Sequence, residues 1–318
     1  MGSNAEDRRL TMSFIFLYGQ PGSGKTTLAA SMTKLGYKVR FIDVDDKVRL
    51  MQNLQGEIKK DNIRITPILS KLTETTMKEA IMSPQIGLIR QPQGYLEICD
   101  IITKYEEMFA RDESPTEQVL VKDSLTSQIE HMKRLIAHIQ GKAHFTYDEW
   151  AIVLSNLEEY FYTMKGLLET ASVTYPESIN ELTGEKIPGS VIPGHPGFKH
   201  IIIIAHETTE RDETTGKVQT LPFIEGQMRH KVGKYFEEVY HCQVEVPKTG
   251  KPIYKVLTVS TDRYSARTSQ ELPVFVSSDF SVILGKAEGK AKGKAKGEAL
   301  DPIQAKVEAA KKAQEEKK

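Results

Sequence analysis

Apolar and polar positions follow two patterns along the first half of the chain. Short, largely apolar stretches at 14–17, 38–46, 62–68 and 118–124 have the length and composition of buried strands. At 95–109, 129–139 and 150–168, apolar residues instead recur every three or four positions, as they do on one face of a helix. Strands that alternate with helices in this way predict a parallel sheet with helices on both faces.

The second half of the chain adds a different pattern. A strongly apolar stretch at 200–205 predicts one more buried strand. Residues 239–246 and 253–260 alternate around a turn at 247–250, which predicts an antiparallel hairpin. The predicted fold class is therefore α/β, with a mostly parallel sheet flanked by helices and an antiparallel extension near the C-terminus.

Polar segments mark the limits of this predicted domain. Residues 171–199 hold four prolines and four glycines, which predicts a long insertion with room for a small hairpin. Residues 1–12 are polar, and we expect a flexible N-terminus there. The tail at 285–318 is rich in Lys, Ala and Gly and too polar to bury a core, so we expect it to be disordered or partly helical. One domain is thus predicted at 13–284.

The bulk composition narrows the setting of the protein. Lys plus Arg and Asp plus Glu both number 43, so the net charge argues neither for nor against a nucleic-acid partner. The only cysteines are Cys99 and Cys242, too few for a disulfide framework, which is typical of a reducing compartment. The longest apolar run, 201–205, is too short to cross a bilayer. We expect a cytoplasmic protein without a membrane partner.

The most specific motif follows the first predicted strand. Residues 19–26 read Gly-Gln-Pro-Gly-Ser-Gly-Lys-Thr and precede the first turns of a predicted helix. Glycines allow successive backbone N–H groups to point at a polyphosphate, and the helix N-terminus adds partial positive charge. Lys25 would reach the β- and γ-phosphates, and the Thr26 hydroxyl would bind Mg²⁺. The expected nucleotide-binding residues are Gly19, Gln20, Pro21, Gly22, Ser23, Gly24, Lys25, Thr26 and Thr27.

Carboxylates follow two of the predicted strands. Asp45 lies at the end of the second strand, and Asp123 lies at the end of a buried-type strand. Because the C-terminal ends of parallel strands meet at the ligand edge of a sheet, Asp123 would hold Mg²⁺ together with Thr26, and Asp45 would act on water. The alternative is that Asp45 and Asp46 cap the next helix. Lys122 is unusual in such a strand and indicates that one side of it reaches water or a partner.

Polar residues near two later strand ends complete the candidate site. His206 follows the apolar strand at 200–205 and precedes a polar segment, 208–220, which we expect to be a mobile loop. A polar side chain at this strand end can sense a γ-phosphate; an ordinary loop histidine is the alternative. Arg263 and Arg267 come just after the predicted hairpin, where a catalytic role and plain surface exposure are equally compatible with the sequence.

Taken together, these residues resemble the RecA-like ATPase core, and more closely the phage-encoded RecA-related ATPases that act in single-strand annealing and recombination. The resemblance covers about 13–270, without the insertion. It implies that Asp45 polarises the attacking water at a position where relatives usually carry glutamate, and that His206 occupies the sensor position. It also implies that 262–267 form a terminal strand, from which Arg263 or Arg267 reaches the nucleotide of the next subunit.

The function that this resemblance implies is Mg²⁺-dependent ATP hydrolysis coupled to DNA. The implied cofactors are ATP and Mg²⁺. The implied partners are single-stranded DNA, further copies of the chain in a homo-oligomer with nucleotide at the subunit interfaces, and a single-strand-binding protein. One alternative is a nucleotide-gated scaffold or motor component for replication, packaging or defence. Another is a small-molecule or nucleotide kinase, because the motif at 19–26 also occurs in nucleotide kinases.

Overall fold

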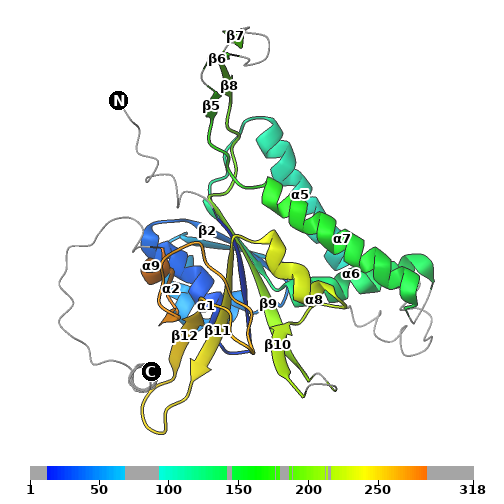
Figure 1. The fold of residues 1–318 in the computed structure, drawn as a ribbon, viewed down its shortest axis with the longest axis vertical. Coiled ribbons are helices and arrows are strands. Elements are labelled where there is room, and N and C mark those ends of the chain that lie inside the picture. The colour runs from blue at the N-terminus through cyan, green and yellow to red at the C-terminus, as the bar shows by residue number, and fades with distance from the viewer. Residues whose placement is uncertain are drawn as a thin grey trace, which may run out of the picture.

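The structure is a computed structural model (Figure 1) that describes most of the predicted domain. Residues 69–92, the N-terminus expected to be flexible and the tail lie outside the described residues. The described ranges are 13–68, 93–141, 145–175, 177–179, 186–187, 189–211, 213 and 216–284.

A nine-stranded sheet forms the centre of the fold, and most of its strands are parallel. Six parallel strands lie side by side in the order β3–β2–β4–β9–β1–β11. The α/β class and the mostly parallel sheet are therefore confirmed. The six strands are β1 (Ser13–Gly19), β2 (Val39–Asp43), β3 (Ile63–Pro67), β4 (Val119–Asp123), β9 (His200–Arg211) and β11 (Glu238–Glu245).

Antiparallel strands extend this sheet, as the sequence predicted for its C-terminal part. β12 (Ile253–Leu257) pairs with β11, and β13 (Phe275–Ser277) forms the edge. In addition, β10 (Val218–Pro222) pairs antiparallel with the outer half of β9. Figure 1 shows the β9–β10 and β11–β12 ribbons projecting from the same end of the sheet.

Helices cover both faces of the sheet (Figure 1). One face is covered by α1 (Lys25–Ala30), α2 (Gln55–Lys59), α9 (Phe280–Ile283) and the 3₁₀ helices η2 (Ser31–Leu35), η3 (Val48–Leu50) and η4 (Gln52–Leu54). The other face is covered by α5 (Gln93–Ala110), α6 (Leu125–Gln140), α7 (Tyr147–Gly166), α8 (Met228–Lys231) and η5 (Val232–Tyr235).

Local sequence signals explain where the helices α6 and α7 begin and where α6 ends. Ser124 directly follows β4, and its hydroxyl accepts a hydrogen bond from the backbone N–H of Ser127, which begins α6 at the site edge. Gly141 ends α6 in the left-handed conformation that glycine adopts without strain. Thr146 and Glu149 form a capping box at the start of α7.

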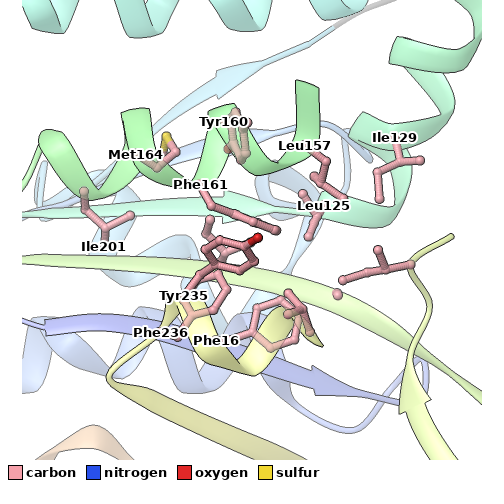
Figure 2. Packing of buried hydrophobic residues seen from close by; sticks show 14 of the residues in the cluster. Phe16, Leu125, Ile129, Leu157, Tyr160, Phe161, Met164, Ile201, Tyr235 and Phe236 are labelled. Carbon is pink, nitrogen blue, oxygen red and sulfur yellow. The ribbon is translucent and has the colours of Figure 1, made fainter. Parts of the chain in front are cut away.

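Two apolar clusters fill the space between the sheet and its helices. In the larger one, Phe161 of α7 packs against Phe236, with ring centroids 5.4 Å apart, and Phe236 lies 4.8 Å from Phe16 of β1. Figure 2 shows these rings between α7 and the sheet. The second cluster lies under α1 and α9. Since both faces of β1 are buried, the strand that precedes residues 19–26 is rigidly held.

Three predictions about irregular segments meet different outcomes. The insertion at 171–199 does contain short antiparallel pairs, β5 (Val173–Tyr175) with β8 (Ser190–Ile192) and β6 (Ser178–Ile179) with β7 (Lys186–Ile187). The mobile loop predicted at 208–220 is wrong, because β9 and β10 pair through most of it. Residues 262–267 form isolated bridges instead of the terminal strand that the family resemblance implied.

Lys122 does not reach water, contrary to the sequence-based expectation. Its side chain is fully buried, and Nζ has no hydrogen-bond partner among the described residues. Its neighbours in the sheet are Ile42 and Ile203, which both belong to the larger apolar cluster. Burial therefore holds the pKa of Lys122 well below its usual value.

We expect Lys122→Met to stabilise the protein, because methionine fills a similar volume without burying an unpaired amine. The free energy of unfolding in urea at pH 7 should rise by about 1–3 kcal/mol. In the wild type the unfolded lysine, with a pKa of about 10.4, binds a proton more tightly than the folded one. The free energy of unfolding of the wild type should therefore increase as the pH rises towards 10, and that of Lys122→Met should not show this increase.

The exposed Lys104→Met on α5 is the control, for which both quantities should stay close to wild type. A Lys122→Met variant that unfolds more easily than wild type would mean that the amine has a stabilising partner.

Candidate functional site

Residues 19–26 form a tight loop between β1 and α1. Lys25 is the first residue of α1 and is only 5% exposed. Its Nζ donates hydrogen bonds to the backbone carbonyl oxygens of Gly19 and Gln20, both at 2.7 Å. Burial lowers the pKa of Lys25. The loop thus folds around its own lysine, and it connects a strand to a helix as the sequence predicted.

Two glycines are required by the local geometry of this loop. A Cβ on Gly19 would lie 2.4 Å from the carbonyl oxygen of Cys242 in the adjacent strand β11. Gly24 has φ of +85°, and a Cβ there would lie 3.0 Å from the ring of Tyr254. A side chain at Gly19 would therefore displace backbone, and one at Gly24 would press on an aromatic ring, within the loop that is predicted to bind phosphate.

Thr26 and Asp123 are brought into direct contact. The Thr26 hydroxyl donates to Asp123 Oδ2 at 2.6 Å, and both side chains are buried. Asp123 Oδ1 is also buried and has no hydrogen-bond partner among the described residues. A threonine hydroxyl beside a carboxylate with an oxygen left over suits Mg²⁺, which prefers oxygen ligands. The residues present therefore fit the metal that the sequence predicted.

Asp45 lies beside this pair, although it is two residues beyond the end of β2. Its Oδ1 accepts hydrogen bonds from the hydroxyls of Ser127 and Ser124, and its Oδ2 accepts one from Lys47 at 2.7 Å. His206 Nε2 lies 3.7 Å from the same Oδ2. Burial opposes the ionisation of Asp45, but its interactions with His206, Lys47 and Ser127 outweigh burial and hold its pKa below the usual value.

Lys47 lies between the two carboxylates, at a position that no feature of the sequence predicted. Its Nζ is 3.3 Å from Asp123 Oδ1, an ion-pair distance without hydrogen-bond geometry, in addition to its bond with Asp45. Burial opposes its charge, yet Asp123 and Asp45 raise the pKa of Lys47 above the usual value. A lysine two residues after a strand-end acid has no distinguishing spacing, so only the fold shows its position.

A cavity of about 610 Å³ opens over the loop, large enough for a nucleotide. It contains predicted loop residues that would face phosphates, together with His206 and Lys47. Its wall also includes the apolar Met51 and the aromatic Tyr254, which the sequence did not predict as site residues. The lining residues are Pro21, Gly22, Gly24, Lys25, Thr26, Thr27, Lys47, Met51, Asn53, His206, Tyr254 and Ser278.

A buried acid–histidine pair lies on the other side of the loop. Glu207 follows His206 in β9 and contacts His241 Nε2 at 2.6 Å, and both side chains are less than a tenth exposed. Gln243 lies 3.0 Å from the other ring nitrogen, and Tyr264 stacks on His241 with centroids 4.2 Å apart. Adjacent residues of β9 thus face a nucleotide-sized cavity and a buried polar pair.

The two predicted arginines lie away from this cavity within the chain. Arg263 donates to the Thr220 hydroxyl at 3.3 Å and lies over the Tyr264 ring. Arg267 donates to the carbonyl oxygen of Phe236. Both arginines are exposed. A role at the nucleotide of another subunit concerns contacts between copies, so it stays a prediction.

No family model matches this chain, and a search of the curated proteins found no relative. Across the described ranges, no helix has both the length and the apolar character that crossing a membrane requires.

We expect Gly24→Ala to impair phosphate binding by the loop in addition to straining the backbone. Gly36→Ala is the matched control, because Gly36 has φ of +86° and open space around it. Each variant should lose about 1 kcal/mol of unfolding free energy from left-handed backbone strain. Gly24→Ala should in addition lose the thermal stabilisation that tripolyphosphate gives the wild type. Equal stabilisation of both variants by tripolyphosphate would contradict a phosphate site at this loop.

Proposed function

We propose that this protein is a Mg²⁺-dependent ATPase with a RecA-like core, which binds single-stranded DNA and acts as an oligomer in phage-type recombination or strand annealing. The observation that carries the proposal is the Thr26–Asp123 contact at the mouth of a loop that encloses Lys25. Lys25 and Thr26 begin α1 directly after the glycine loop, and Asp123 ends the distant strand β4. Their convergence suits one ligand class, a metal-bound polyphosphate.

The chain's own residues have distinct roles in this proposal. Lys25 and the loop N–H groups would bind the phosphates, while Thr26 and Asp123 would hold Mg²⁺. The metal, when bound, neutralises charge that develops on the phosphate oxygens. Asp45 would orient the attacking water, since its low pKa keeps it a hydrogen-bond acceptor at neutral pH. His206, within reach of Asp45 and in the cavity wall, would report whether the γ-phosphate is present.

The RecA-like assignment and the DNA partner draw support from the β9–β10 ribbon. The strand that carries His206 continues to Arg211, so a shift at the γ-phosphate would move the ribbon with it. Exposed basic side chains lie on this ribbon and on the helical segment that follows. They include Arg211, Lys217, His230, Lys231 and Lys234. Arg211, Lys217 and His230 line one hollow together with Glu210. Basic side chains that gather in this way suit nucleic acid, because charge on the phosphate backbone dominates its affinity for proteins.

A nucleotide-gated scaffold is the second candidate, and the contacts of Asp45 favour it. Both oxygens of this carboxylate are already engaged, one by serine hydroxyls and the other by Lys47. A base that stays engaged in the nucleotide complex would orient water poorly, and the protein would then hold ATP without turnover. Retention of unhydrolysed ATP through gel filtration would favour the scaffold over the ATPase.

We expect Lys25→Ala to abolish ATP hydrolysis, by at least about a hundredfold, because the lysine supplies charge to the transferred phosphate. Phosphate release with saturating Mg²⁺ and ATP measures this. Lys133→Ala is the control, since Lys133 pairs with Glu130 and Glu225 outside the cavity. Wild-type turnover by Lys25→Ala would refute the site, and absence of turnover in the wild type with ATP retained would support the scaffold.

We also expect charge reversal on the ribbon to weaken DNA binding. Arg211→Glu combined with Lys231→Glu should lower affinity for a single strand roughly tenfold at moderate salt, because phosphate contacts dominate it. The slope of log affinity against log salt should fall by about 0.7 for each phosphate that is no longer neutralised. Fluorescence anisotropy measures both, with Lys59→Glu on α2 as the control. Unchanged affinity in the double variant would exclude this surface as the DNA site.

A further inference from the structure

Lys47 is held where a metal ion would have to act. Its Nζ lies 2.7 Å from Asp45 Oδ2 and 3.3 Å from Asp123 Oδ1, so one ammonium serves two carboxylates. Asp123 is the residue whose second oxygen contacts Thr26. The lysine therefore occupies the open side of the proposed magnesium ligand.

The backbone around Lys47 is fixed, whereas its side chain is partly free. Asp43 Oδ2 accepts a hydrogen bond from the backbone N–H of Val48 at 2.7 Å, which anchors the start of η3 to the end of β2. The Lys47 side chain is 38% exposed and lines the same cavity as Lys25 and His206. The ammonium can consequently leave the carboxylates without moving the chain.

An ammonium and a divalent cation cannot share these carboxylate oxygens. Mg²⁺ requires oxygens at about 2.0–2.1 Å in octahedral geometry, and a lysine a few ångströms away would repel it. Without a metal, two carboxylates that contact the same ammonium need that positive charge as a counter-ion, and Lys47 supplies it. With a metal bound, phosphate oxygens become the nearest anionic groups inside the cavity.

We propose that Lys47 and Mg²⁺ are alternative counter-ions of Asp45 and Asp123, so that binding of the metal–nucleotide complex releases Lys47 from the carboxylates towards the phosphates. This inference rests on the proposed nucleotide site and adds to it a competition between Lys47 and Mg²⁺ for the same carboxylates. The chain thus supplies its own competing cation, and Asp45 Oδ2 becomes free to accept a hydrogen bond from water only when the metal has entered.

The test measures how much Mg²⁺ the protein needs to bind nucleotide. A fluorescent, non-hydrolysable ATP analogue is titrated into the full chain at a series of free Mg²⁺ concentrations. The Mg²⁺ concentration at half-maximal affinity is then compared between variants. Lys47→Met removes the competing charge, so its midpoint should shift to lower Mg²⁺ by roughly tenfold, a modest effect because the lysine shared by both ion pairs is 38% exposed. Lys47→Arg keeps the charge and should stay near wild type.

Lys133→Met is the matched control, because Lys133 also bridges two carboxylates, Glu130 and Glu225, at 2.9 and 3.1 Å. Its Mg²⁺ midpoint should not move. A Lys47→Met midpoint that is unchanged, or shifted to higher Mg²⁺, overturns the competition while leaving the nucleotide site intact. Failure of the wild type to bind the analogue at any Mg²⁺ concentration overturns both the competition and the proposed function.

Discussion

The hydrogen bond between Thr26 and Asp123 is the contact on which the rest of the site depends. It joins the first turn of α1 to the end of β4, although 97 positions separate the two residues. The bond is possible because β1 and β4 flank β9 as parallel strands and end beside its middle, with Gly19 opposite His206 and Asp123 opposite Ile204. Both partners are buried, so losing either would leave a polar group without water or a partner, at a considerable cost.

The position of β9 determines where His206, Glu207 and the β9–β10 ribbon lie relative to that bond. It lies between β1 and β4 and pairs Gly19 with His206, which sets the histidine beside the glycine loop. Successive residues of a strand point to opposite faces, so His206 faces the cavity and Glu207 faces His241. The same strand then runs on to Arg211 and pairs with β10. One rigid element thereby connects the nucleotide-sized cavity to the basic ribbon.

Three lysines near the site differ in their burial and in the groups that contact their ammonium. Lys47 is partly exposed and bridges two carboxylates, an arrangement that a second cation can compete with. Lys25 is buried but satisfied by backbone carbonyl oxygens. Lys122, one residue before the proposed metal-binding aspartate, is buried without a described partner. The alternation of β4 explains the contrast, because Lys122 and Asp123 point to opposite faces of the sheet.

The sequence alone determined the α/β class, the loop at 19–26 and the position of Asp123 at the end of β4, because those features depend on local periodicity and spacing. It placed Asp45 and His206 at strand ends, whereas Asp45 lies two residues beyond β2 and His206 lies within β9. It misjudged 208–220 and Lys122, since strand pairing overrides polar composition and a lysine's surroundings lie on other elements. Only the tertiary structure decided that Lys47 bridges Asp45 and Asp123, and that Tyr254 from β12 lies over Gly24. The contacts of Lys47 with Asp123 and of Tyr254 with Gly24 join residues far apart in the chain, and the order of the strands in the sheet, which no local pattern encodes, brings them together.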